Sequence, residues 1–376
     1  MKIWDVIVVG AGPGGSTTAA RLAMAGCDVL LVDKERFPRE KPCSDIYGQA
    51  AAPVYKEIGA YDELLKNGYL FPGLMMTSPD YTALTGQNEL SICCPRRVGD
   101  NILKETAARR GAKVLEEFWV NDLMMNRGQV VGVKGKYEGK FVEYPARIVI
   151  GADGSHSWVA KRLGLFLDDY DEVFVAGRAY YADCDPPLKN VEVHYDPSFF
   201  PGFICLSPHP GYGNIVNMGH GYQMTPYVQA KEDVEKLMQK FVDTSPYGEK
   251  LRKARPVSDY MGWRVPSAGQ IGKTYAAGAM LIGDAGSFVS PFILEGVANS
   301  VRSGGCAVQT SLEALEKGDF SESFLSIYQK RWKEILQPKF DILQQMAVTA
   351  RNADMLNATV KSLQENPEAV VKLVLD

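Results

Sequence analysis

Residues 3–15 read Ile-Trp-Asp-Val-Ile-Val-Val-Gly-Ala-Gly-Pro-Gly-Gly, a short apolar run rich in β-branched residues followed by glycines at G-x-G-x-x-G spacing. An Ala-rich segment comes next, and a second apolar run, Val29 to Val32, ends at Asp33. Strand, glycine turn, helix, strand and acid follow one another in the order of a dinucleotide-binding unit. This stretch therefore predicts a phosphate-cradling loop in an α/β domain.

Each part of this unit has a physical reason. Gly10 permits the tight turn, Gly12 lets the backbone approach a pyrophosphate, and Gly15 lets the helix pack closely on the sheet. The helix N-terminus offers unpaired N–H groups and a positive dipole end to the phosphates. Asp33 can accept hydrogen bonds from ribose hydroxyls and would repel a 2′-phosphate, which disfavours NADP despite the adjacent Lys34. NAD and FAD both remain open from this unit alone.

Length and composition narrow the class of protein. The chain has 376 residues, 46% of them hydrophobic, and a net charge of −4 without a long basic run, which argues against a nucleic-acid partner. No apolar run approaches the roughly 18 residues of a membrane-spanning helix. The seven cysteines are scattered, and neither they nor the four histidines form a metal-ligand pattern. Reduced thiols, a cytoplasmic location and no bound metal are expected.

Changes in sequence character predict the domain organisation. Residues 173–221 are rich in Tyr, Phe, Val, Pro and Gly and lack helical periodicity, which indicates an antiparallel sheet, and residues 231–241 are expected to form an amphipathic helix on it. The expected fold class is α/β: a Rossmann-like FAD-binding domain interrupted by an antiparallel-sheet substrate domain, with a C-terminal helical segment that Pro338 and Pro367 punctuate. The expected boundaries are 1–70, 95–170 and 270–330 for the first domain, 71–94 and 171–269 for the second, and 331–376 for the C-terminal helices.

Two later motifs favour FAD. Ile150-Gly-Ala-Asp-Gly154 ends a buried strand at Asp153, and Leu281-Ile-Gly-Asp-Ala285 ends another at Asp284. Pro291, Glu295 and Gly296 follow the second motif and lead into a helix. A carboxylate at a strand end can bind ribityl hydroxyls, and N–H groups at a helix start can face a flavin carbonyl.

With these three motifs the chain resembles the FAD-binding fold of p-hydroxybenzoate hydroxylase and its relatives, and within it the geranylgeranyl reductase family. The family's Lys-x-Cys-Gly loop is similar to Lys41-Pro-Cys-Ser44, and its Arg-x-x-Phe-Asp-x-x-Leu helix to Arg96-Arg-Val-Gly-Asp-Asn-Ile-Leu103. Its Gly-Asp-Ala-Ala-Gly and Pro-x-x-Gly-Glu-Gly-Ile motifs correspond to Gly283 to Val297. The resemblance covers nearly the whole chain.

The resemblance implies roles for matching residues. Asp33 and the glycine turn would hold the AMP half of FAD, Arg96 the phosphate or ribityl region, and backbone at Val120 the adenine. Asp284 would bind ribityl hydroxyls, and Asp153 would brace the loops. The expected cofactor-binding residues are Gly10, Gly12, Pro13, Gly14, Gly15, Asp33, Lys34, Cys43, Ser44, Arg96, Val120, Asp153, Gly283, Asp284, Pro291, Glu295, Gly296 and Val297.

Departures from the family pattern concern the substrate. Cys-Gly is Cys43-Ser44 here, and Gly-Glu-Gly is Leu294-Glu295-Gly296, which puts a bulky side chain beside the flavin. The family's Tyr-x-Trp-x-Phe-Pro strand appears as Phe203-Ile-Cys-Leu-Ser-Pro208, without two of its aromatic residues. These departures weaken the expectation of a geranylgeranyl substrate in particular.

The leading hypothesis is an FAD-dependent oxidoreductase that reduces C=C bonds of an apolar, isoprenoid-like or polyketide-like substrate by hydride transfer from reduced flavin. Cys43 and Tyr47 are the candidate catalytic residues, as proton donors near the flavin. The alternatives are a flavin monooxygenase or halogenase that uses O2, and a non-catalytic flavin redox sensor. The electron donor would be NAD(P)H, ferredoxin or another flavoprotein, and a lipid-like substrate would imply peripheral contact with a membrane.

Overall fold

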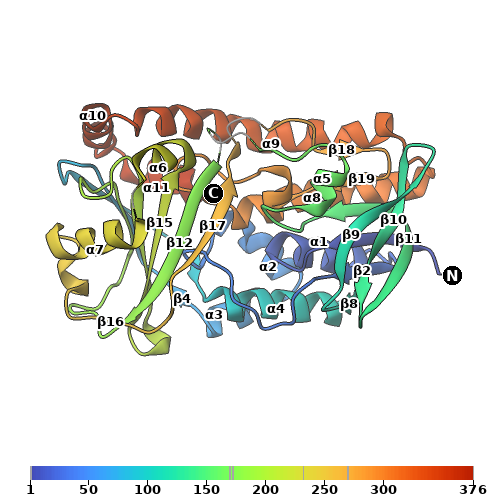
Figure 1. The fold of residues 1–376 in the computed structure, drawn as a ribbon, viewed down its shortest axis with the longest axis horizontal. Helices are drawn as coiled ribbons and strands as arrows, with labels where there is room; N and C mark the ends of the chain where they lie inside the picture. The colour runs from blue at the N-terminus through green and yellow to red at the C-terminus, as the bar shows by residue number, and fades with distance from the viewer. Residues whose placement is uncertain (1, 169–170, 172, 232, 269–270, 376) are drawn as a thin grey trace.

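The computed structural model describes residues 2–168, 171, 173–231, 233–268 and 271–375. Two large sheets lie side by side along the long axis of the molecule, and helices cover the right-hand sheet in Figure 1. A mixed α/β sheet, a second and largely antiparallel sheet, and a helical C-terminus are all present. The expected fold class is confirmed.

The first sheet carries the N-terminal strand at its centre. Its order is β18-β19-β11-β1-β2-β8, with β10 and β9 continuing from β11 as an antiparallel meander. The strands β19, β11, β1, β2 and β8 run parallel. Their bounds are β1 (Trp4–Val9), β2 (Val29–Val32), β8 (Lys113–Leu115), β9 (Trp119–Asn126), β10 (Gln129–Tyr137), β11 (Lys140–Gly151), β18 (Tyr275–Ala276) and β19 (Ala279–Leu281).

Both faces of the first sheet are buried. Val6 and Val8 belong to the core on the helical face, and Ile7 and Val9 to the core under the meander. This alternation follows from the two-residue period of a strand. The helices and 3-10 turns of this half are α1 (Pro13–Met24), η1 (Gln49–Ala51), α2 (Ala52–Glu57), α3 (Tyr61–Lys66), α4 (Arg96–Arg109), α5 (Trp158–Arg162), η6 (Gly283–Gly286) and α8 (Val297–Lys317).

The second sheet has the order β16-β12-β15-β14-β13-β5-β6, with β17 also paired to β12. Its pairs are antiparallel except β13 with β5. Its strands are β5 (Gly73–Thr77), β6 (Ala83–Gln87), β12 (Val173–Ala182), β13 (Val191–His194), β14 (Phe203–His209), β15 (Ile215–Gln223), β16 (Arg255–Pro256) and β17 (Met261–Pro266). With it go η3 (Pro210–Tyr212), α6 (Met224–Ala230), α7 (Val234–Thr244) and η4 (Glu249–Leu251).

Smaller elements join the two halves. A three-stranded sheet consists of β3 (Ile46–Tyr47), β7 (Ile92–Cys93) and β4 (Tyr69–Leu70). Its strands belong to the segments in which the chain passes from the first half to β5 and back from β6. The helices α9 (Glu322–Thr349), α10 (Ala353–Leu363) and α11 (Pro367–Leu375) close the fold, and α9 runs across both halves at the top of Figure 1. Trp332 of α9 is buried in the first core and Leu343 in the second.

One local prediction was wrong. Pro338 does not interrupt the C-terminal helices but lies inside α9. Phe340, two residues later, is buried in the first core, so packing on both sides of the proline outweighs the lost hydrogen bond. Pro367, by contrast, begins α11.

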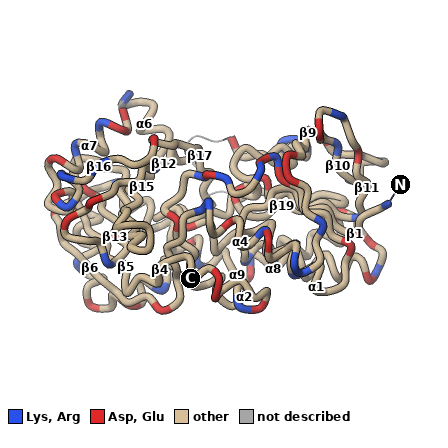
Figure 2. The backbone as a smooth tube through the Cα atoms, turned by 90° about the horizontal axis from the view of Figure 1, so that it is seen from below, with Lys and Arg blue, Asp and Glu red and all other residues tan. Residues whose placement is uncertain are grey.

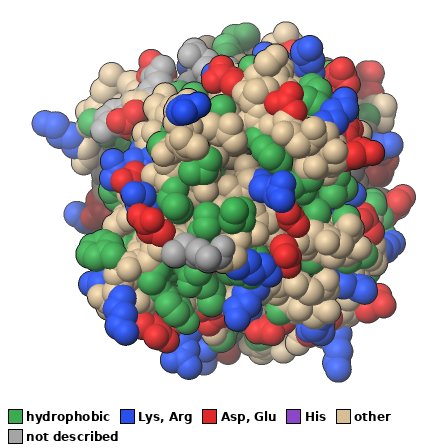
Figure 3. Space-filling model, turned by 90° about the vertical axis from the view of Figure 1, so that its right-hand side faces the viewer, with side chains coloured by type: hydrophobic (Ala, Val, Ile, Leu, Met, Phe, Trp, Pro, Cys, Tyr) green, Lys and Arg blue, Asp and Glu red, His purple; other side chains and the backbone are tan. Residues whose placement is uncertain are grey.

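Charged residues of both signs are distributed along the chain in both halves of the molecule. In Figure 2, Lys and Arg alternate with Asp and Glu along both halves, and Figure 3 shows the same mixture with scattered hydrophobic side chains at the meander end. Among the described residues, no helix is both long and apolar enough to cross a membrane.

Candidate functional site

A cavity of about 620 Å³ lies where the two sheets meet. Its volume falls in the range of small-molecule and cofactor sites. The first half contributes the β1–α1 turn, the loop after β2, the Asp153 turn and the start of α8. The described residues that the second sheet and its connections contribute are Leu74, Ala176, Gly177, Val193, Phe203, Cys205, His220, Met261, Trp263 and Val265.

The glycine turn forms one wall of the cavity, and two of its positions accept only glycine. Gly10 has φ 105°, and a Cβ there would overlap the backbone of Ala152. A Cβ on Gly15 would overlap the carbonyl oxygen of Gly10. At Gly12, the N-cap of α1, the nearest atom to a Cβ would be Arg39 Nη2 at 3.8 Å. The helix start therefore faces open space, as phosphate binding requires.

Asp33 is held at the end of β2 by the backbone around it. Ala11 N donates to Oδ2 at 2.7 Å, and Glu35 N donates to Oδ1 at 2.9 Å. The residue is only 8% exposed yet lines the cavity. Each carboxylate oxygen can accept a second hydrogen bond, so the group can receive ribose hydroxyls without moving.

Asp153, at the end of β11, also lines the cavity, but its oxygens are occupied. Ser157 Oγ donates to it at 2.5 Å and Trp158 N at 2.7 Å, which fixes the start of α5. Burial raises the pKa of Asp153, and these hydrogen bonds oppose that shift. The carboxylate therefore positions the loops beside the cavity.

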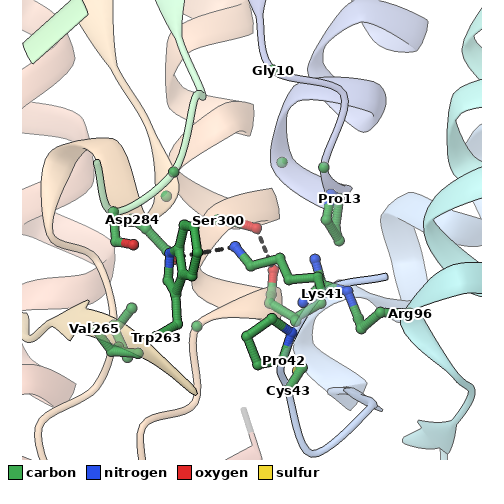
Figure 4. A pocket seen from close by; sticks show the side chains of 18 of the residues that line it. Gly10, Pro13, Lys41, Pro42, Cys43, Arg96, Trp263, Val265, Asp284 and Ser300 are labelled. Atoms are coloured by element: carbon green, nitrogen blue, oxygen red, sulfur yellow. Dashed lines mark hydrogen bonds and ion pairs between the residues drawn. The ribbon is translucent and has the colours of Figure 1, made fainter. Parts of the chain in front are cut away.

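Asp284, in η6 after β19, also lines the cavity. Its Oδ2 lies 3.4 Å from Lys41 Nζ, which comes from the loop after β2. Figure 4 shows Lys41, Asp284 and Trp263 converging on one space from three separate elements. Asp33 and Asp284 thus offer two separate carboxylates to one cavity, which matches the two hydroxyl-bearing parts of a flavin dinucleotide.

The start of α8 completes this wall. Gly296 is the N-cap and Val297 the first helical residue, and both line the cavity. Glu295 Oε1 accepts from Ala298 N at 2.7 Å, whereas its buried Oε2 has no hydrogen-bond partner. Burial raises the pKa of Glu295. The N–H groups of Gly296 and Val297, unlike that of Ala298, remain able to donate to an acceptor in the cavity.

Arg96 lines the cavity and forms a buried ion pair with Asp100. Its Nε and Nη2 donate to the two oxygens of Asp100 at 2.7 and 2.9 Å. Tyr47 Oη donates to the same carboxylate at 2.8 Å, and Tyr47 is not among the described cavity-lining residues. Pairing of β3 with β7 and the contact with Asp100 hold this hydroxyl on the same carboxylate oxygen that Arg96 Nε contacts, and the catalytic role of Tyr47 stays a prediction.

Asp45 anchors the loop that contains Cys43. This fully buried carboxylate accepts from Tyr180 Oη at 2.6 Å, Asn217 Nδ2 at 2.7 Å and Arg96 N at 3.1 Å. His209 Nε2 lies 3.1 Å from it. Asn217 Nδ2 also donates to the carbonyl oxygen of Cys43 at 2.7 Å. The second sheet thus fixes the position of a loop that belongs to the first half.

The cavity brings together most of the residues that the sequence suggested. It is lined by Gly10, Gly12, Pro13, Gly14, Gly15, Asp33, Lys34, Cys43, Ser44, Arg96, Val120, Asp153, Gly283, Asp284, Glu295, Gly296 and Val297. Pro291 is not among the described lining residues; it lies in the turn that the Ser290 N to Glu295 O hydrogen bond closes at 2.8 Å. Sequence reasoning left out Arg39 and Lys41 as site residues, although their positive charges in the loop after β2 could have indicated them.

These features fit FAD on structural grounds. Glycine at positions 10 and 15 allows the tight turn and the close packing of α1, and the carboxylates of Asp33 and Asp284 line the same cavity. When bound, FAD supplies hydride-transfer chemistry through its ring, while the protein supplies position and electrostatics. The class is therefore an FAD-dependent oxidoreductase with a Rossmann-like cofactor fold.

Comparison with known proteins agrees with this class. The family model described as "FAD binding domain" matches residues 4–338. Digeranylgeranylglycerophospholipid reductase 2 of Methanopyrus kandleri is 30% identical over 379 residues, covering 99% of this chain and 92% of the relative. Reductase 1 of the same organism is 29% identical, covering 96% of each chain. The chain therefore belongs to the geranylgeranyl reductase family of FAD-dependent oxidoreductases.

Solved structures show the same fold. A geranylgeranyl bacteriochlorophyll reductase-like protein from Thermoplasma acidophilum superposes with a TM-score of 0.89 at 23% identity, covering 100% of this chain and 95% of that one. A flavin-dependent brominase superposes with a TM-score of 0.86 at 19% identity, covering 100% and 94%. At these identities the likeness concerns the fold alone.

Proposed function

We propose that this flavoprotein reduces C=C bonds of an apolar, isoprenoid-like or polyketide-like chain. The observation that carries the proposal is the character of the second half of the cavity. None of its described lining residues is Asp, Glu, Lys or Arg, whereas the first half contributes charged groups throughout. An uncharged wall facing a flavin site suits a hydrocarbon chain. The names of the curated relatives, digeranylgeranylglycerophospholipid reductases, support the same substrate class.

We assign the cofactor to the residues around the glycine turn. Asp33 would accept the adenosine ribose hydroxyls, the start of α1 would hold the pyrophosphate, and Asp284 would accept ribityl hydroxyls. Gly296 and Val297 would face the flavin ring. The position of these groups in one cavity supports this assignment.

Alkene reduction adds a hydride to one carbon and a proton to the other. We propose that Cys43 Sγ provides the proton, because this half-buried thiol lies on a cavity loop that Asn217 and Asp45 anchor. Cys205, on β14, is a second thiol of the cavity lining and lies beside Ser44, the neighbour of Cys43, and burial raises its pKa to about 11. Cys205 therefore keeps its proton at neutral pH and is the alternative source.

Two further parts of the proposal concern partners. Electrons would come from NAD(P)H, ferredoxin or another flavoprotein that binds transiently. A lipid-like substrate would be taken from a membrane through peripheral contact. Sedimentation of the FAD-loaded protein with phospholipid vesicles tests the second point; absence of protein from the vesicle pellet at low salt would contradict it.

Anaerobic reoxidation tests the reaction directly. The FAD-loaded protein is reduced with dithionite under argon, polyprenyl alcohols are added, and flavin absorbance is followed. Recovery of oxidised flavin with a saturated product supports the reductase. Strict dependence on O2 with an oxygenated or halogenated product would favour the oxygenase class instead, and a flavin that no alkene or O2-dependent substrate reoxidises would favour a redox sensor.

Substitutions of individual cysteines test the identity of the proton donor. C43A is expected to slow reoxidation by the alkene about 100-fold, within the usual contribution of a general acid, while FAD binding is retained. C27A is the matched control, because Cys27 is also half-buried but does not belong to the described cavity lining. An unchanged rate in C43A and a slow rate in C205A would transfer the role to Cys205.

A further inference from the structure

Leu294 adopts a backbone conformation that favours glycine. Its φ is 58°, in the turn between η6 and the start of α8. In this region the Cβ of an L-residue crowds the carbonyl oxygen that follows it, so a branched side chain is disfavoured and glycine is not. Non-glycine residues held in this way cluster at ligand sites. The presence of leucine at 294 therefore needs an explanation beyond the turn itself.

The turn does not need the side chain. Ser290 N donates to Glu295 O at 2.8 Å, and Glu295 N donates to Ser290 Oγ at 3.2 Å, so main-chain and serine groups close it. Neither bond involves Leu294. A glycine at this position would keep both.

The side chain of Leu294 instead reaches the second sheet. It lines the cavity, and its Cδ1 lies only 2.7 Å from the place where a Cβ on Gly221 would stand. The ring of Phe203, which pairs with Gly221 across β14 and β15, comes equally close to that point. Leu294 and Phe203 thus occupy together the space that a side chain at position 221 would need.

We infer that Leu294 is a specificity-determining residue whose side chain closes the apolar part of the cavity and limits the size of the chain that fits there. The inference rests on the proposed function of this cavity, since it concerns an apolar ligand. Leu294 comes from the cofactor half and touches the substrate half, so it acts at the boundary where substrate and flavin would meet.

The test measures binding without turnover. Farnesol and geranylgeraniol, which differ by one isoprene unit, are titrated into oxidised, FAD-loaded protein, and the change in the flavin spectrum gives two dissociation constants. L294G is expected to shift the ratio of these constants at least tenfold in favour of geranylgeraniol. L294M, which keeps the side-chain volume, is expected to leave the ratio within twofold of the wild-type value.

S287G is the matched backbone control. Ser287 has φ 63°, close to that of Leu294, but is not among the described cavity-lining residues. S287G relieves the same crowding and is expected to leave the ratio unchanged. If L294G is not recovered as folded protein, L294A replaces it, with a smaller shift in the same direction.

The outcomes separate the two proposals. An unchanged ratio in folded L294G or L294A would overturn the role of Leu294 while leaving the proposed function intact. Failure of the wild-type protein to bind either alcohol would contradict the apolar substrate class itself. A shifted ratio in a protein that does not reduce alkenes would support Leu294 as a selectivity residue and refute only the reaction.

Discussion

The two halves of the cavity are built by different means. The cofactor half depends on main chain: glycines without Cβ atoms, helix starts and carboxylates fixed at the ends of β2 and β19. The substrate half consists of uncharged side chains spread over strands of the second sheet, several of them far apart in sequence. Cofactor chemistry is thus tied to local backbone geometry, whereas substrate choice depends on long-range packing.

Removing a glycine should break the cofactor half most severely. In G15A the new Cβ would overlap the carbonyl oxygen of Gly10, so the turn must open or α1 must move away from the sheet. We expect loss of FAD binding and a fall in the free energy of unfolding of about 3 kcal/mol, as for overpacking at a rigid site. Flavin absorbance of the purified protein and urea unfolding measure the two effects.

Gly211 provides the control for that substitution. It lies in η3, and a Cβ there would meet nothing within 4 Å. G211A should bind FAD normally. Retention of FAD by G15A at wild-type affinity would show that the turn is less constrained than the contacts indicate.

Cutting the link between the halves should have the next largest effect. D45A leaves Tyr180, Asn217 and the nearby His209 without their buried acceptor. We expect a loss of about 2–3 kcal/mol in the free energy of unfolding, because buried groups are left unpaired, and slower reoxidation of reduced flavin by alkenes as the Cys43 loop loosens. Urea unfolding and anaerobic reoxidation measure these effects.

An exposed ion pair serves for comparison with Asp45. Asp28 pairs with Lys2 at 2.9 Å, and its side chain is 60% exposed. D28A should change the free energy of unfolding by less than about 1 kcal/mol. Equal losses in D45A and D28A would contradict the anchoring role of Asp45.

Low pH should lower the free energy of unfolding through two buried histidines of the substrate half. Burial lowers the pKa of His220 to about 3 and also lowers that of His194. The histidines of the unfolded chain take up protons below about pH 6.5, whereas the folded His220 ring stays neutral down to about pH 3. The contribution of the neutral His220 ring to the free energy of unfolding is therefore complete above pH 6.5 and falls by about 1.4 kcal/mol per pH unit below it, and His194 acts in the same direction.

Urea unfolding at pH 7.5, 6 and 5 measures this dependence. H220Q removes one of the two rings, so its free energy of unfolding should fall less steeply between pH 6 and pH 5 than that of the wild-type protein. The same slope in both proteins would mean that His220 takes up a proton in the folded state.

The cofactor half could largely be predicted from sequence because its determinants are local. Gly10, Gly15 and Asp33 lie within one strand–helix–strand unit. The spacing of this unit in the sequence is enough to predict the backbone geometry that requires each of them. Asp153 and Asp284 end buried strands, and parallel strands bring their carboxyl ends to one edge. These regularities are sufficient to predict a flavin dinucleotide as the cofactor.

The rest depended on contacts between distant segments. Tyr47 is only four residues from Cys43, but the pairing of β3 with β7 sends its hydroxyl to Asp100. Leu375 lines the cavity from the far end of the chain, because α11 packs against the second sheet. No periodicity or motif in the sequence reports such contacts.

The long helix α9 has a consequence for how the protein melts. Its Trp332 and Leu336 are buried in the core of the first half and its Leu343 in the core of the second, so neither core can come apart without disturbing the same helix. Such sharing favours one cooperative transition over two independent ones. Free energy gained from a cofactor bound at the β1–α1 turn is then transmitted to the entire chain, and the distant substrate sheet gains thermal resistance from a ligand that belongs mainly to the other half.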